Sequence, residues 1–217
     1  MTIYTNAGLG IAMSSVIGTA TAITGITKAD PGVLTSAAHG LSDGEFVLLN
    51  ILGMVELDER VFEVYAKDTN TFQLKDVDGA SGVNTTDFST FSSGTFSQVT
   101  FGTTVTGVQE FSPSGGDVKF LDTTTVHDLT DKQTVNGATA MSYTLTMQWD
   151  PEDAAQQAMK VAFQTAANSA IKITWPAGIY MMFYGTVGFS GAAGGTSQGV
   201  TTSPAAIAMN GIPTYSQ

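Results

Sequence analysis

Apolar residues recur at every second position along much of the chain, which is the pattern of β-strands with one buried face. The clearest case is Tyr143–Trp149, where four large apolar side chains alternate with threonine and glutamine. Ile171–Trp175 and Ile179–Phe189 flank the turn residues Pro176-Ala177-Gly178, and this order predicts a hairpin. Further strands are predicted at Phe46–Leu52, Val61–Ala66 and Thr71–Lys75. The chain is therefore expected to be mostly β.

One α-helix is expected to interrupt the strands, at about residues 151–167. Asp150 can cap its start, and Pro151 suits the first helical position. Its apolar side chains recur at helical spacing, which predicts a helix lying on a sheet. The expected packing face consists of Ala155, Met159, Ala162, Phe163 and Ala166.

The length of 217 residues allows one or two domains. Charge is unevenly distributed: residues 20–98 hold eleven of the nineteen acidic residues and four of the eight basic ones. After Asp153 there is no acidic residue at all. This asymmetry predicts two units, of which residues 20–98 form one.

The overall composition excludes several classes of function. A net charge of −11 leaves no broad basic surface for binding phosphates, and the absence of cysteine excludes disulfides, thiolate metal sites and thiol nucleophiles. Only 12% of the residues are charged, so much of the surface is expected to contact partners. Residues 1–27 are uncharged, but small polar residues interrupt their apolar runs, and no membrane insertion is expected.

The candidate catalytic patterns lack their required partners. Gly195–Gly199 matches the G-x-S-x-G motif around Ser197, but no acid or histidine follows it. His39 and His127, the two histidines, fall in different predicted units, so a zinc site is not expected. Carboxylates for glycoside hydrolysis are available as Glu56, Asp58 and Glu59, although adjacent acids usually form a solvated turn. No cofactor or metal is expected, and the chain is not expected to be an enzyme.

Four segments in the second half carry a resemblance to a known family. They are Glu110–Gly116, Val118–Thr124, the stretch Met147–Ala158 with its Asp150-Pro151-Glu152-Asp153-Ala154-Ala155 helix start, and Ile171–Gly178. In this order they resemble the tail tube proteins of long-tailed bacteriophages, over residues 99–217 and a first strand near 3–17. Residues 20–98 depart from that pattern. They resemble a small β module common in phage structural proteins, through His39–Gly44, Gly53–Leu57 and Asn70–Leu74. The resemblance thus implies a tube body formed by residues 1–19 and 99–217, with the small β module inserted at 20–98.

The resemblance implies a β-sandwich subunit, able to form a β-barrel on assembly, with one flanking helix and no active site. It also implies a structural virion protein whose hexameric rings stack into the tail tube, a hollow conduit for genome delivery. The implied partners are the chain itself, a tape-measure protein, tail terminator and baseplate proteins, and double-stranded DNA that passes without sequence-specific binding. The implied location is the virion tail, assembled in the bacterial cytoplasm, with the module outside the tube.

The resemblance also implies two sets of site residues. A loop at about Thr123–Ala140 is expected to contact the next ring, through Val126, His127, Asp128, Leu129, Asp131, Lys132 and Val135. Candidate lumen-facing acids, which would keep DNA from sticking, are Glu110, Asp117 and Asp122. A different interpretation, a carbohydrate- or receptor-binding tail module, would use aromatic residues such as Tyr65, Phe88 and Phe91 as ligand platforms.

Overall fold

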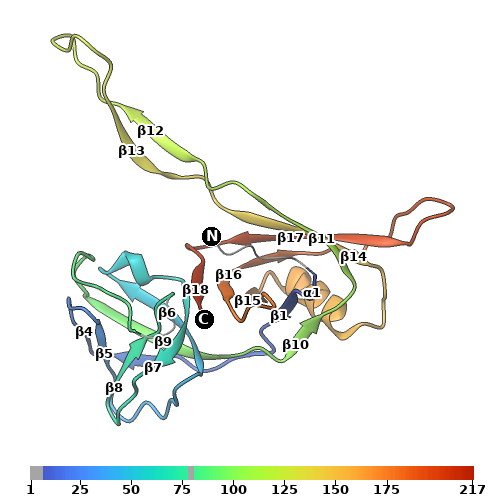
Figure 1. The fold of residues 1–217 in the computed structure, drawn as a ribbon, viewed down its shortest axis with the longest axis horizontal. Coiled ribbons are helices and arrows are strands. Elements are labelled where there is room, and N and C mark those ends of the chain that lie inside the picture. The colour runs from blue at the N-terminus through green and yellow to red at the C-terminus, as the bar shows by residue number, and fades with distance from the viewer. Residues whose placement is uncertain (1–6, 78–80) are drawn as a thin grey trace.

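The structure is a computed structural model that describes residues 7–77 and 81–217 (Figure 1). Within these residues it is mainly β and contains one α-helix, which confirms the predicted fold class. The strands fall into a body sheet, a module sheet and a projecting two-stranded arm. Residues 3–6 of the predicted first strand lie outside the described residues, and the rest of that segment contributes strands to both sheets.

The body sheet contains eight strands of the described chain, all paired antiparallel. Their order in the sheet is β10 (Thr103–Val105), β1 (Gly10–Met13), β15 (Asn168–Thr174), β16 (Tyr180–Gly188), β17 (Thr202–Met209), β14 (Ser142–Gln148) and β11 (Val108–Ser114), with β18 (Thr214–Ser216) paired to β16. The predicted hairpin of β15 and β16 is confirmed. Edge strands β10 and β11 are only two residues apart in sequence, so the sheet must curl to bring its edges together, as in a β-sandwich.

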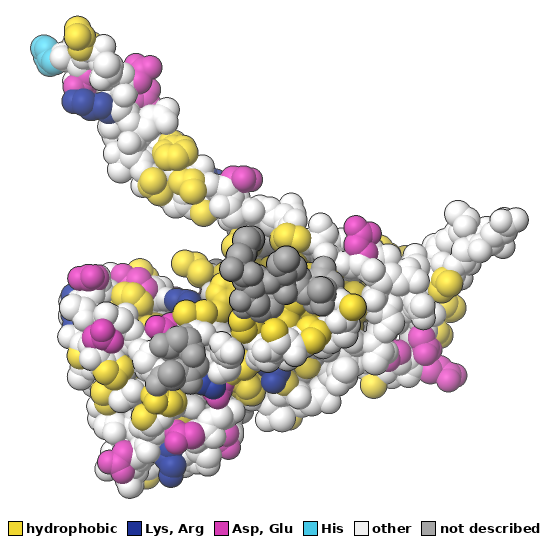
Figure 2. Space-filling model, in the orientation of Figure 1, with side chains coloured by type: hydrophobic (Ala, Val, Ile, Leu, Met, Phe, Trp, Pro, Cys, Tyr) yellow, Lys and Arg dark blue, Asp and Glu magenta, His cyan; other side chains and the backbone are white. Residues whose placement is uncertain are grey.

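The module sheet also contains eight described strands and has its own apolar core (Figure 2 shows acidic side chains spread over its surface). Their order is β2 (Val16–Ile17), β9 (Ser93–Thr100), β6 (Phe46–Leu52), β7 (Val61–Tyr65), β8 (Thr71–Leu74), β5 (Val33–Thr35) and β4 (Gly25–Ile26), with β3 (Thr21–Ile23) paired to β9 and a 3₁₀ turn, η1, at Val55–Leu57. The sheet therefore begins before residue 20 and ends after residue 98.

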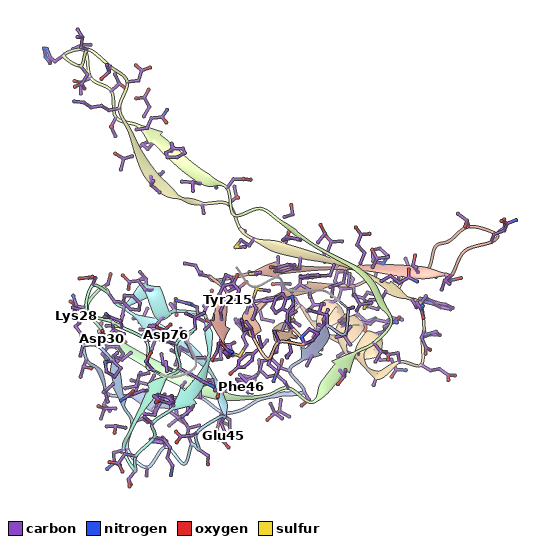
Figure 3. The ribbon with its side chains drawn as sticks, viewed as in Figure 1. Lys28, Asp30, Glu45, Phe46, Asp76 and Tyr215 are labelled. Carbon is purple, nitrogen blue, oxygen red and sulfur yellow. The ribbon has the colours of Figure 1, made fainter. Side chains whose placement is uncertain are left out.

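A third buried cluster joins the module to the body. Val61 and Val99 of the module pack with Ala170 and Met182 of the body. Around them, the Lys172 Nζ lies over three aromatic rings, 4.5 Å from the centroid of Phe46, 5.3 Å from Phe101 and 5.6 Å from Tyr180 (Figure 3 labels Phe46). Burial lowers the pKa of Lys172, and the nearby charge of Glu63 opposes that shift. The two units thus share a packed joint.

Helix α1 spans Ala154–Thr165, so it begins three residues later than predicted. The N-cap is Asp153, whose carboxylate accepts hydrogen bonds from the amides of the second and third helical residues at 3.0 and 2.9 Å. Asp150 and Pro151 instead form a turn before the helix, closed by a bond from the Asp153 amide to the Asp150 carbonyl. Asp153 is the better cap because its side chain satisfies two free amides at once. The predicted cap at Asp150 is therefore wrong.

The face that α1 buries is narrower than predicted. Ala155, Met159 and Ala162 are buried in the body core, but Phe163 is 50% exposed and Ala166 is exposed at the left-handed C-cap. At about 100° per residue Phe163 lies about 80° around the helix from Ala155, so it falls at the side of the buried stripe. The predicted packing face is wrong at these last two positions.

Aspartate substitutions should distinguish the buried side of α1 from its exposed side by their effect on stability. Met159→Asp buries an unpaired carboxylate and should destabilise the isolated subunit by roughly 3 kcal/mol or more. Phe163→Asp should cost under about 1 kcal/mol, because that side chain is half exposed. Urea unfolding of dilute protein measures both. Equal losses would contradict this assignment.

The arm, residues 115–141, is the outer half of one long β-ribbon (Figure 1). Its strands β12 (Val118–Asp122) and β13 (Gln133–Ala138) continue β11 and β14 beyond the edge of the body. Every residue of β12 and β13 is exposed. The predicted contact loop at Thr123–Ala140 is therefore the turn and the returning strand of this hairpin.

A glycine pair marks the point where the ribbon leaves the body. Gly115 has a φ of +81°, and a Cβ there would collide with the carbonyl oxygen of Ala140 on the facing strand. Just beyond this point the Thr139 amide donates to the Asp117 carbonyl at 2.9 Å. The close approach of the two backbones requires glycine.

Replacing Gly115 with alanine should loosen the base of the arm by about 1–3 kcal/mol, because the variant adds a collision to an unfavourable φ. The matched control is Gly137→Ala, which has a φ of +96° but nothing within 4 Å of its Cβ. Hydrogen exchange of the Thr139 amide should rise more in the first variant. Equal exchange in both would show that the collision is relieved without cost.

Candidate functional site

The arm tip, the turn at residues 123–132 between β12 and β13, gathers most of the predicted contact residues. The structure places Val126, His127, Asp128, Leu129, Asp131 and Lys132 in this turn and Val135 on β13. Val126 is 96% exposed and Leu129 is 102% exposed. Large apolar side chains held this far into water are typical of a contact surface.

Asp128 organises the turn. Its carboxylate pairs with the Lys132 ammonium and accepts hydrogen bonds from the Thr125 amide and hydroxyl, both at 2.9 Å. These partners, Lys132 first, lower the pKa of Asp128. The stabilisation from ionised Asp128 is therefore present above the unfolded pKa of about 3.9, and it is lost as the pH falls through the lower folded value. The turn keeps its shape at neutral pH.

The shaft of the arm carries apolar residues that sequence reasoning missed as contact candidates. Val118, Phe120 and Leu121 on β12 are all exposed, and Phe120 is paired in the ladder with Val135. Figure 2 shows hydrophobic side chains gathered along the arm. The signal was available in the sequence, because this apolar stretch is flanked by charged residues, but only the structure shows that no core covers it.

The three candidate lumen acids do not lie on one surface patch. Glu110 is exposed on β11 in the body, Asp117 lies at the base of the arm, and Asp122 ends β12 near the arm tip. Hydrogen bonds from Thr124 lower the pKa of Asp122. All three nevertheless lie on the same strand side of the β-ribbon, the continuous run from β11 to β12.

The carboxylates considered for glycoside chemistry have structural partners. Asp58 accepts a hydrogen bond from the Ile51 amide at 2.8 Å, and Glu56 accepts from the amide and hydroxyl of Ser89 at 3.0 and 2.8 Å. Glu59 has a positive φ in the tight turn before β7. The Glu56 bonds hold the turn after β6 to the segment that precedes β9, and the Asp58 bond holds the same turn to β6 itself.

The remaining candidate motifs are also dispersed. His39 accepts a hydrogen bond from the Leu41 amide at 3.1 Å and packs against the Phe72 ring in the module, whereas His127 lies at the arm tip. Ser197 lies in the exposed loop between β16 and β17. The described part of the chain contains no group of three His, Asp or Glu side chains placed to hold a metal ion.

Sequence reasoning also missed Gln156, which ties the helix to the ribbon. Its side-chain amide donates to the Gln148 carbonyl at the end of β14 at 2.7 Å, and its oxygen accepts from the Asp150 amide at 3.2 Å. The side chain is buried although glutamine usually lies at the surface. The sequence clue to it was its position in the Met147–Ala158 stretch.

Comparison with known proteins gives a match to a protein family. The sequence profile of the phage tail tube protein family matches residues 52–217, which include the second part of the module, the whole arm and the helix. No curated protein matches the chain. No helix in residues 7–77 and 81–217 is long and apolar enough to cross a membrane. The match covers well over half of the sequence, and the chain therefore belongs to the phage tail tube protein family, whose members are structural components of the virion tail.

Proposed function

We propose that this chain forms hexameric rings that stack into the tail tube, and that the tube is the conduit for genome delivery. The observation that carries the proposal is the arm, which holds Val126 and Leu129 in water far from any core of its own subunit. A two-stranded ribbon alone gains little stability in water, so contact with a partner surface would stabilise the arm. The interior would hold a tape-measure protein before DNA passes, and terminator and baseplate proteins would bind the two ends of the tube.

The proposed role needs no catalytic residue or cofactor. The lumen would be acidic, because acidic side chains there would repel a polyanion and let DNA pass without sequence-specific binding. Glu110, Asp117 and Asp122 remain the candidate lumen acids, and their place on one ribbon supports grouping them. The virion tail would be assembled in the bacterial cytoplasm.

Removing the apolar tip should block assembly without unfolding the subunit. In the variant Val126→Ser with Leu129→Ser, two exposed side chains become polar, so subunit stability should change by under about 1 kcal/mol. Tubes seen by negative-stain microscopy should be absent or much shorter. The matched control is Leu52→Ser with Val55→Ser, an exposed pair of the same residue types on the module, which should form normal tubes. Normal tubes from the arm variant would refute the arm's role.

We also propose that the inserted module lies on the outside of the tube and is dispensable for it. Its acidic surface and separate core support an exterior position. The sheet pairing suggests removal of residues 16–100 rather than 20–98, since β2 and the end of β9 pair with each other. The Ser15 amide bonds to the Thr100 carbonyl at 2.8 Å, so a short Gly-Ser linker can join the new ends.

The deletion should give tubes with the same lumen and a smaller outer diameter. It uncovers Met182, so Met182→Lys should accompany it to keep the exposed joint soluble. Microscopy of the two tubes gives both diameters. If the deleted subunit folds, by thermal unfolding, but its tubes lose the lumen wall, the module belongs to the body and the proposed division is wrong.

A further inference from the structure

An arm that contacts another copy of the chain needs a receiving surface elsewhere on the subunit. Rings and stacks are head-to-tail assemblies, in which one patch of each copy meets a different patch of the next. The receiving patch should be apolar, hollowed, and free of the negative charge that dominates this protein. Its existence rests on the proposed function, because a subunit that never assembles needs no such surface.

Most exposed large apolar side chains off the arm fall in three places within the described residues, while Val16 on β2, Val200 in the loop before β17 and Tyr215 on β18 are exposed elsewhere. The module carries Leu52 and Val55, but it is strongly acidic. Ile212 lies beside the base of its own subunit's arm. The third place is the outer side of α1, where Val161 and Phe163 are exposed. Only the third is both apolar and remote from the acidic module.

Two hollows lie beside α1 and share Phe189 in their linings. One, of about 300 Å³, is lined by Trp149, Lys160 and Gly191. The other, of about 290 Å³, is lined by Phe163 together with β16 and β17 residues that include Ala206. We call these two hollows the α1 groove. Phe189 itself is buried, so the groove has an apolar floor and open sides.

The charges of the two surfaces are complementary. The arm contains four acidic residues and two lysines, and its tip includes Asp128 and Asp131. The chain from residue 154 onward contains no acid, and Lys160 is exposed in the groove. Asp150 and Glu152 border the first hollow, next to its lining residues Trp149 and Pro151, but among the described residues Lys160 is the one charged side chain in the lining of either hollow. An acidic tip is therefore attracted to the Lys160 side of the groove, toward Phe163, and repelled by the module.

We infer that the arm tip of one copy docks in the α1 groove of a second copy. Val126 and Leu129 fill the two hollows beside Phe163 and Phe189, and Asp131 faces Lys160. Asp128 is already engaged by Thr125 and Lys132, so the turn is formed before it docks and loses little entropy on binding. The exposed Phe163, which the sequence placed in the core, then has a role at the contact between subunits.

Disulfide trapping tests this contact cleanly because the chain contains no cysteine. Leu129→Cys and Phe163→Cys are made in separate chains, mixed, assembled and mildly oxidised. A cross-linked dimer on a non-reducing gel is expected from the mixture. The control mixture pairs Leu129→Cys with Val55→Cys, an equally exposed position on the module, and should give no dimer above background. Tubes whose first mixture gives no more dimer than the control would overturn the inference.

A charge exchange gives a second measurement that does not depend on cysteine. Lys160→Glu should shorten tubes, and adding Asp131→Lys should restore their length, since both side chains are exposed and folding should be unchanged. Tubes from Lys160→Glu that Asp131→Lys fails to restore would place the arm on another surface. Unmodified protein that forms no ring or tube would overturn the proposed function itself, and that outcome is separate from tubes that assemble with the arm docked elsewhere.

Discussion

Strand β14 is the element on which the rest of the molecule depends, because it pairs with β17 along one edge and with β11 along the other. Its outer face is polar and its inner face supplies Leu145 and Met147 to the core. The ribbon of β11 and β14 can therefore extend beyond the body as the arm while its inner half stays fixed by the sheet. Gln156 bonds to the last residue of the same strand, so the helix is placed from the same element. The arm and the α1 groove, which we propose to meet between copies, are therefore both positioned by β14.

The packed joint between module and body fixes the orientation of one unit to the other. The aliphatic residues of the joint are buried against each other. The Lys172 ammonium lies over three aromatic rings, which stabilise its charge there. The Lys75–Glu63 ion pair, at 3.0 Å, lies in the module beside this joint and compensates charges that are mostly buried. Because the joint is packed, the module stays in one orientation to the body, and every subunit in an assembly presents it in the same way.

Sequence patterns identified the strands well where one face is buried, as in Phe46–Leu52, which the structure reproduces residue for residue. Sequence patterns gave wrong or missing predictions where capping, the position of an apolar stripe or the lack of a buried face determines the structure. The helix start moved to Asp153 because capping geometry, which composition does not reveal, favours it. Phe163 looked like a core residue because periodicity alone cannot locate the centre of an apolar stripe. Gln133–Ala138 was not recognised as a strand, since a ribbon with no buried face leaves no alternation to read.

The arm also shows how an exposed apolar ribbon can avoid nonspecific strand pairing. A two-stranded ribbon has two open edges, and such edges invite pairing with any other strand. Here Lys119 and Asp122 lie on β12, Asp117 precedes it, and Lys132 precedes β13, so charged side chains stand beside the open strand edges while the apolar side chains are exposed to water. Strand addition is thereby disfavoured, and contact through side chains remains available. A contact of that kind depends on the shape and charge of the receiving surface. In the α1 groove the described lining is largely apolar and its one charged side chain is Lys160, which favours an acidic arm tip.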